Sequence, residues 1–310
     1  MWRTLSATSQ VAAPVHNLFT PIVFSVYIFK VRPQMIFTFS FVILHTLVAK
    51  VFEALRSKSQ GECRIIYCSE NYIIVDKEPD LKINSNNKNE RTLQTFLKSK
   101  CPAVAKKKLF HEYYFPHRLD YPTSGIICIP KNEKACRAVA KAFSERDTKK
   151  YYIAIVRGIF SADLVDINLP IGDDAREVAI HKMCTDNVVF CRNPRNAQTV
   201  ITVLDEGIFA NYPATKILCR IITGRRHQIR VHCSHLGHTI VGDYTYSNRK
   251  DVQPPRMYLH CIRLIVPVTI EKIDVSTSDA FTQVKFWTKE KMVQDLSSAY
   301  NTIDQYINSL

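Results

Sequence analysis

From residue 63 onward the chain mixes short strand-like runs with helical runs in no regular order, and this pattern restricts the fold most. Residues 64–68 and 72–75 flank a Ser-Glu-Asn turn and predict a β-hairpin. The regular βα repeat that a doubly wound parallel sheet requires does not occur. The sequence therefore predicts an α+β fold. We expect further strands up to about residue 222, and at residues 151–156, 257–268 and 283–287.

Four stretches predict helices, and the first of them, residues 86–108, is polar and basic and is consistent with a loop and a helix. Asn132 is a typical N-cap, and apolar residues recur at helical spacing from there to about Arg146. A short basic helix is expected before Gly237, which suits a left-handed helix end, with an apolar face formed by Ile229, Cys233 and Leu236. An amphipathic helix is expected from Lys291, with a stripe of Met292, Leu296, Tyr300, Ile303 and Ile307.

Residues 1–61 differ from the rest of the chain. They carry six Lys or Arg but one acidic residue, Glu53, and they include two apolar runs, 18–29 and 35–49. Each run is shorter than the roughly 20 apolar residues that span a bilayer, so a membrane-spanning helix is disfavoured. A transit peptide, a membrane-associated segment and an artefact of the gene model remain open. We divide the chain into this extension (1–61), a main domain (62–290) and a C-terminal amphipathic helix (291–310).

The formal net charge is +14, from 42 basic and 28 acidic residues, and it indicates a polyanionic partner. Ten cysteines without a C-x-x-C pair are too dilute for a disulfide scaffold. They predict reduced, mostly buried thiols in an intracellular protein, either mitochondrial or cytoplasmic and nuclear. Neither a Walker A sequence nor G-x-G-x-x-G occurs, so we expect no nucleotide cofactor.

The segment 116–125 reads Pro-His-Arg-Leu-Asp-Tyr-Pro-Thr-Ser-Gly and precedes an apolar strand. Its Arg118 and Asp120 belong to a loop at a strand end, where catalytic groups tend to occur. From spacing alone, a surface ion pair followed by an ordinary turn is the simpler interpretation. Both interpretations stay open at this point.

The segment 223–238 reads Thr-Gly-Arg-Arg-His-Gln-Ile-Arg-Val-His-Cys-Ser-His-Leu-Gly-His. We expect one helix to present Arg226 and Arg230 together at i and i+4. A helix start after Gly224, assisted by Arg225, could hold a phosphate, and a solvated basic face is the alternative. The histidines and cysteines lack the spacing of a tetrahedral metal site, so we predict no metal.

Four segments occur in a fixed order: His117-Arg-Leu-Asp120 with Thr123-Ser-Gly125, then 150–158, then 223–232, then Leu236-Gly-His with Gly242-Asp243. This set closely resembles the RluA-type RNA pseudouridine synthases, and its details are most similar to the animal branch of RNA pseudouridine synthase domain-containing proteins. The resemblance extends from about residue 63 to about residue 268. It implies an α+β pseudouridine synthase fold with a long mixed, mostly antiparallel sheet and a central active-site cleft.

The resemblance also implies site residues. Asp120 matches the catalytic aspartate, and Arg230 matches the arginine that pairs with it. Tyr152 matches the tyrosine that packs on the target uracil, and Arg118 matches the arginine that fills the space of the extruded base. We further expect contacts to RNA from Arg225, Arg226 and His227.

Such an enzyme breaks the N1–C1′ bond of uridine, turns the freed uracil and rejoins it through C5. No atom or electron is gained or lost, so no cofactor is expected, and tRNA, rRNA or mRNA is the expected partner. Asp120 could act as a nucleophile or as a base, and both routes stay open. We expect a monomer without membrane association.

The chain departs from the family in one place that matters for the fold. The family commonly has Lys-Pro-x-Gly near its first hairpin, whereas residues 76–80 keep Lys77 but lack the glycine. The alternative function is a catalytically inactive RNA-binding module with the same fold. A membrane-associated protein is a third hypothesis, and it depends on residues 18–49 alone.

Overall fold

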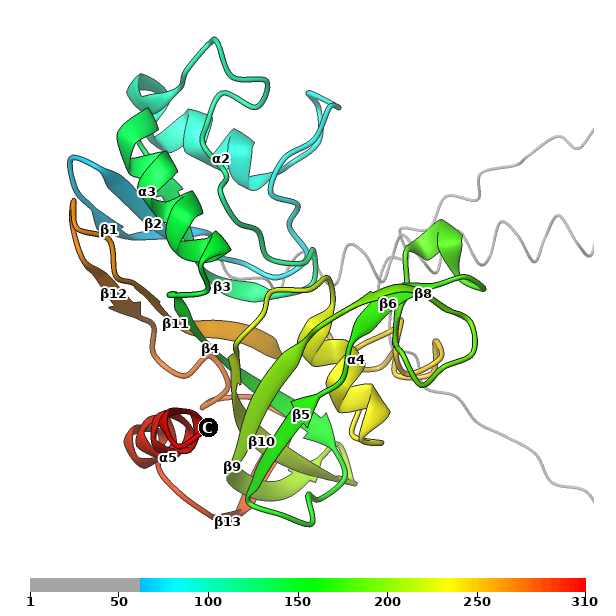
Figure 1. The fold of residues 1–310 in the computed structure, drawn as a ribbon. Coiled ribbons are helices and arrows are strands. Elements are labelled where there is room, and N and C mark those ends of the chain that lie inside the picture. Colours follow the sequence, from blue (N-terminus) through cyan, green and yellow to red (C-terminus); the bar gives the residue numbers. More distant parts are fainter. Residues whose placement is uncertain (1–61) are drawn as a thin grey trace, which may run out of the picture. The chain divides into compact units, whose positions relative to one another are not determined.

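A ten-stranded sheet forms the centre of residues 62–310, the part of the chain that the computed structural model describes (Figure 1). The predictions for residues 1–61 lie outside the described residues. The strands of this sheet are β1 (Arg64–Cys68), β2 (Tyr72–Lys77), β3 (Ser124–Pro130), β4 (Lys149–Arg157), β5 (Leu164–Asn168), β9 (Gln198–Phe209), β10 (Tyr212–Ile221), β11 (Leu259–Val266), β12 (Ile273–Ser276) and β13 (Trp287–Met292). A second, three-stranded sheet contains β6 (Ile171–Asp174), β7 (Met183–Thr185) and β8 (Cys191–Arg195).

The main path of the large sheet is β1-β2-β3-β11-β4-β10-β9-β13, while β12 pairs with β11 and β5 pairs with β9. Its pairs are antiparallel except β3 with β11, which is parallel. The predicted mixed, mostly antiparallel sheet is therefore confirmed, as are the α+β class and the first hairpin.

Both faces of the sheet are covered. The helices are α2 (Leu93–Lys100), α3 (Glu133–Ser144), α4 (Gln228–His235) and α5 (Leu296–Asn308), with short 3-10 turns at Pro102–Val104 and Val178–Ile180. Helices α3 and α4 pack on the face that carries Tyr152, whereas α2 and α5 pack on the opposite face. All seven residues of β3 are buried, and after its first residue, Ser124, the strand is continuously apolar, as burial on both faces requires.

Local sequence explains where the helices begin. The Asn132 side chain accepts a hydrogen bond from the Ala135 backbone N–H, as its predicted N-cap role requires. Thr92 caps α2 with a capping box, and Asp295 caps α5. These caps satisfy backbone N–H groups that have no partner inside their own helix.

Gly125 permits the one parallel pairing. Its φ is +110°, and a Cβ there would lie 2.3 Å from the Cys261 carbonyl oxygen. Only glycine tolerates both the backbone conformation and this approach of β11. The loop that carries Asp120 therefore leads directly into the middle of the sheet.

Two predictions near the C-terminus are wrong. Of the strand predicted at residues 283–287, only Trp287 belongs to a strand, because the strand in this region is β13, Trp287–Met292, and residues 283–286 form turns. The last helix starts at Leu296 and not at Lys291, and Met292 is an exposed strand residue. The boundary drawn at 290/291 therefore falls inside β13, and α5 belongs to the same compact unit as the sheet.

Residues 62–310 contain no helix that is both long and apolar enough to cross a bilayer. All ten cysteines are free thiols, as predicted, and six of them are buried.

Candidate active site

A cleft of about 550 Å³ opens on the α3 and α4 face over the central strands of the sheet. Its lining includes every site residue predicted from the sequence: Arg118, Asp120, Tyr152, Arg225, Arg226, His227 and Arg230. Six of the lining residues are Lys or Arg, whereas Asp120 is the one carboxylate that lines it among residues 62–310. The cleft is therefore cationic with a single acidic group.

Lys77 binds the turn that follows Asp120. The Lys77 ammonium is fully buried and donates hydrogen bonds to the carbonyl oxygens of Glu78, Leu81 and Tyr121, at 2.8, 3.0 and 3.2 Å. Burial lowers the pKa of Lys77 to about 8. Asp80, where the family's glycine is absent, adopts φ +51°, a left-handed conformation that aspartate tolerates. The missing glycine therefore leaves the turn intact.

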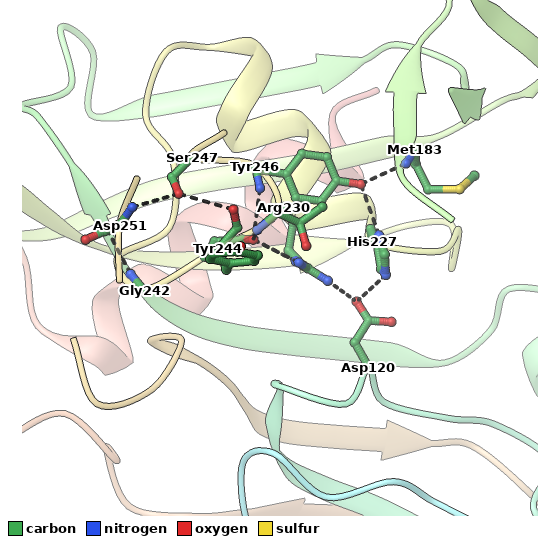
Figure 2. A network of polar contacts seen from close by, with 11 residues as sticks. Asp120, Met183, His227, Arg230, Gly242, Tyr244, Tyr246, Ser247 and Asp251 are labelled. Carbon is green, nitrogen blue, oxygen red and sulfur yellow. Dashed lines mark hydrogen bonds and ion pairs between the residues drawn. The ribbon is translucent and has the colours of Figure 1, made fainter. Parts of the chain in front are cut away.

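Arg230 reaches Asp120 from α4, but its closest partner is a different carboxylate. Its Nε and Nη2 donate to the two oxygens of Asp243 at 2.7 and 2.8 Å. Its Nη1 lies 3.6 Å from Asp120 Oδ2 (Figure 2). Burial acts to lower the pKa of Arg230, but the bonds and charge of Asp243, with a contribution from Asp120, together raise it. The expected pairing with Asp120 is thus present as a longer contact, and Asp243 fixes the guanidinium plane.

His227 faces the same oxygen of Asp120, with Nε2 4.0 Å from Oδ2 (Figure 2). Burial, followed by the positive charges of Arg230 and Arg226, lowers the pKa of His227 to about 3, so the ring is neutral. Its Nδ1 lies 3.0 Å from the Tyr246 hydroxyl, which accepts a hydrogen bond from the Met183 backbone N–H. Because a carboxylate faces Nε2, the tautomer with its proton on Nε2 is favoured, and Nδ1 then accepts from Tyr246.

Tyr152 lies at the floor of the cleft on β4 and is 8% exposed. Burial, with a smaller contribution from the charge of Asp120, raises its pKa, so the phenol stays protonated. An aromatic ring that is buried apart from its cleft side is a suitable surface for stacking a base.

One prediction about α4 is wrong. The helix begins at Gln228, because His227 adopts φ +56° and the segment before it is a loop. Arg226 is therefore an exposed loop residue and shares no helical face with buried Arg230. Gly237, at φ +81°, ends the helix as predicted, and Ile229 and Cys233 are buried on the sheet side.

The loop before α4 is held by Gln228. The Arg225 backbone N–H donates to the Gln228 side-chain oxygen at 2.9 Å, and that oxygen also accepts from the Thr223 hydroxyl at 2.7 Å. The Arg225 guanidinium donates to the Asn196 carbonyl at 2.9 Å. Arg118 is exposed and also lines the cleft. Within residues 62–310, no three His, Cys, Asp or Glu side chains gather as a metal-binding group.

Sequence reasoning missed Asp243, Tyr246 and Lys150. Asp243 had a usable signal, since a buried arginine requires a buried carboxylate and Asp243 belongs to one of the quoted segments. Tyr246 follows it three residues later and packs over the Arg230 guanidinium at 5.0 Å. Lys150 stands two residues before Tyr152 on the same strand, and therefore on the same face of the sheet.

A cationic cleft with one carboxylate, on a long mixed sheet, defines an enzyme that acts on a polyanion. A family model described as RNA pseudouridylate synthase matches residues 71–235. RNA pseudouridylate synthase domain-containing protein 1 of Danio rerio is 40% identical over 218 residues, which cover 70% of this chain and 74% of the relative. The dual-specificity RNA pseudouridine synthase RluA of Pasteurella multocida is 31% identical over 222 residues, covering 70% of this chain and 93% of the relative.

A solved structure of human RNA Pseudouridylate Synthase Domain Containing 1 superposes with a TM-score of 0.70 at 33% identity, over 78% of this chain and 94% of the human one. The chain therefore belongs to the RluA-type family of RNA pseudouridine synthases. It is an isomerase whose substrate class is RNA.

Proposed function

We propose that the Asp120 carboxylate is the catalytic group of this synthase and converts a uridine to pseudouridine in a structured RNA. The observation that carries the proposal is its position as the one carboxylate lining the cationic cleft in the described chain, residues 62–310. Simple attraction of a polyanion would not call for an acid there, because a carboxylate repels phosphates.

The two oxygens of this carboxylate have different surroundings. Arg230 Nη1 and His227 Nε2 both face Oδ2. These contacts, of 3.6 and 4.0 Å, are longer than hydrogen bonds, and they turn Oδ2 toward both side chains. Oδ1 is then the oxygen that attacks the ribose or the base, or that removes a ribose proton.

The reaction is balanced without a cofactor. The N1–C1′ bond breaks, the uracil turns, and the C5–C1′ bond forms while the proton on C5 passes to solvent and N1 gains one. The target base must leave its stack, which costs a few kcal/mol for a duplex and less for a loop. Stacking on Tyr152 offsets about 1–3 kcal/mol of that cost, and the exposed Arg118 occupies the space that the base leaves.

The test is Asp120→Asn, which keeps the shape of the side chain but removes its charge. Pseudouridine formed in total cellular RNA by the purified full chain is measured by mass spectrometry of nucleosides. We expect the variant to lose activity and to keep its RNA affinity. The matched control is Asp147→Asn, which removes an exposed carboxylate that does not line the cleft.

Undiminished activity of Asp120→Asn would overturn the assignment. Tight RNA binding by a wild-type chain that forms no pseudouridine would instead favour the inactive RNA-binding module.

A further inference from the structure

Three lysines of the described part have side chains almost entirely inside the protein, and two of them are fully partnered. Lys77 donates to three carbonyl oxygens. Lys216 pairs with the carboxylates of Asp279 and Asp205. Lys150 differs, because within residues 62–310 its ammonium has neither a hydrogen-bond nor an ion-pair partner, although the residue is only 9% exposed. Its Nζ does not belong to the fully buried side-chain atoms that lack a partner, so it keeps access to solvent in the cleft. An ammonium this enclosed and without a counter-charge is stabilised by an anionic ligand.

The Lys150 side chain lines the active-site cleft. Its Nζ lies 5.1 Å from the centre of the Phe143 ring, and 3.7 Å from where a Cβ of Gly224 would be. It therefore stands between the end of α3 and the loop before α4. A glycine at 224 leaves the space in front of the ammonium open on that side.

Two further cations line the same wall. Arg146 follows α3 and Arg225 follows Gly224, and both border the cleft. Burial, followed by the positive charges of Arg146 and Arg195, lowers the pKa of Arg225. Like charges held together without a carboxylate form a site that an anion stabilises.

We propose that Lys150, with Arg146 and Arg225 at its rim, forms a subsite for one phosphodiester of the RNA backbone beside the target nucleotide. The proposal rests on the proposed function, since it takes RNA to be the occupant of the cleft. An RNA strand that delivers its uridine to Asp120 must pass its backbone along a wall of this cleft. The wall with three cations and no acid matches that backbone in charge.

Other groups near Lys150 do not compete for this role. His117, on the neighbouring loop, is neutral, because burial and then the charge of Lys150 lower its pKa to about 3. Cys261, on β11, stays a thiol, because burial raises its pKa to about 12. Tyr152 stays a phenol. The other charged groups among residues 62–310 that line the cleft, besides Arg146 and Arg225, are Arg118, Asp120, Arg226 and Arg230.

Burial lowers the pKa of Lys150 itself to about 8. RNA binding should therefore weaken as the pH rises from 7 through 9, and a bound phosphate will move this loss toward higher pH. This pH dependence of RNA binding should disappear in a variant that lacks the Lys150 ammonium.

The experiment uses Lys150→Met, which keeps the length of the side chain without its charge. The control is Lys149→Met, the same charge change one residue earlier, where the lysine pairs with Asp304 of α5. The probe is a six-nucleotide RNA with a single uridine among adenosines, bound by the full chain carrying Asp120→Asn so that no turnover occurs.

We expect Lys150→Met to weaken binding about tenfold or more, and to lower the slope of log K against log salt by about 0.7. Lys149→Met should leave the slope near that of its parent. As a second measurement, one methylphosphonate is placed at each linkage of the probe in turn. At one linkage, the methylphosphonate should weaken binding to the parent protein as much as Lys150→Met does. The same probe should bind Lys150→Met no more weakly than the unmodified probe does.

An unchanged salt slope for Lys150→Met, or equal effects of both lysine changes, would overturn the subsite. So would a methylphosphonate series in which no single linkage matters, and this result needs no folded variant. These outcomes concern binding alone. Failure of the proposed function would appear separately, as pseudouridine formation by Asp120→Asn or as none by the wild type.

Discussion

Arg230 binds Asp243 through two hydrogen bonds, of 2.7 and 2.8 Å, and turns only its third nitrogen toward Asp120, at 3.6 Å. The arginine is 4% exposed and Asp243 is 1% exposed. Asp243 also accepts from the backbone N–H groups of Thr245 and Tyr246. The orientation of the guanidinium beside the proposed catalytic carboxylate is therefore set by a residue outside the cleft lining.

Asp243→Asn should separate this pair. Breaking a buried ion pair leaves an uncompensated charge and costs about 3–5 kcal/mol of unfolding free energy. Because the freed guanidinium can turn toward Asp120, we expect pseudouridine formation to fall as well. Urea unfolding and single-turnover rates measure the two effects.

The control for Asp243→Asn is Asp274→Asn. Arg263 binds Asp274 with the same two-bond geometry, at 2.9 and 2.9 Å, but this pair is partly exposed on β11 and β12. We expect a cost of about 0–1 kcal/mol there. Equal costs at both sites would contradict the importance of burial for the Arg230 pair.

Tyr246→Phe removes the hydroxyl that fixes the tautomer of His227. Without it, the proton can move to Nδ1, and the lone pair of Nε2 then faces Asp120. We expect a rate loss of about five- to thirtyfold, corresponding to 1–2 kcal/mol, with RNA affinity preserved. A loss that appears in KM alone would contradict a positioning role. A double mutant with His227→Ala whose loss equals the full sum of the two single losses would contradict it too, because a residue that acts through His227 adds nothing once that ring is absent.

Stability should depend on pH through the buried histidines. Burial first of all lowers the pKa of His117 and His227 to about 3, and that of His232 and His260 to about 4. The unfolded chain binds protons at a pKa near 6.5, so between these values it carries more protons than the folded one. Stability is therefore complete above about pH 6.5 and is lost as the pH falls, by about 1.4 kcal/mol per unit for each histidine.

The measurement is urea unfolding at pH 7, 6 and 5. His117→Gln keeps an acceptor for the Cys128 backbone N–H, whose bond to His117 Nε2 is 2.9 Å long. This variant should reduce the slope of unfolding free energy against pH by about 1.4 kcal/mol per unit, the contribution of one histidine. A wild-type stability that is flat over this range would show that these rings are protonated in the folded state.

Lys77→Met should be strongly destabilising. It leaves three carbonyl oxygens without their donor, and each costs about 1–3 kcal/mol when buried. Thermal unfolding of Lys82→Met provides the comparison, because Lys82 forms an exposed pair with Glu90 that is worth about 0–1 kcal/mol. A similar midpoint for the two variants would contradict the clamp that Lys77 forms on the loop after Asp120.

Local patterns were sufficient for the parts of the fold that depend on neighbouring residues. The hairpin of β1 and β2 and the N-cap at Asn132 follow from turn and cap chemistry, and the structure confirms both. Strand β13 could not be found in this way, because five of its six residues are exposed and its sequence has no apolar alternation. It is a strand because its backbone pairs with β9. Likewise, no spacing rule indicates the left-handed conformation of His227 that delays the start of α4.

The site divides in the same manner. The family resemblance supplied four of the seven predicted residues and the basic segment 223–230 supplied the other three, and all seven line one cleft. The contact of Arg230 with Asp243 spans 13 residues across a helix end and a turn, so periodicity does not predict it. The sequence could not single out Lys150, because its distinguishing property is an enclosed ammonium without a hydrogen-bond or ion-pair partner in residues 62–310. That property depends on neighbours that only the folded chain brings together.

The position of β11 has a consequence for biosynthesis. This strand lies between β3 and β4, although it is translated long after both. While a ribosome extends the chain from Arg157 to Leu259, β3 and β4 lack the strand that lies between them in the finished sheet. The floor of the cleft closes only when Leu259–Val266 has emerged, so a nascent chain has no working site and isomerisation begins with the nearly finished polypeptide.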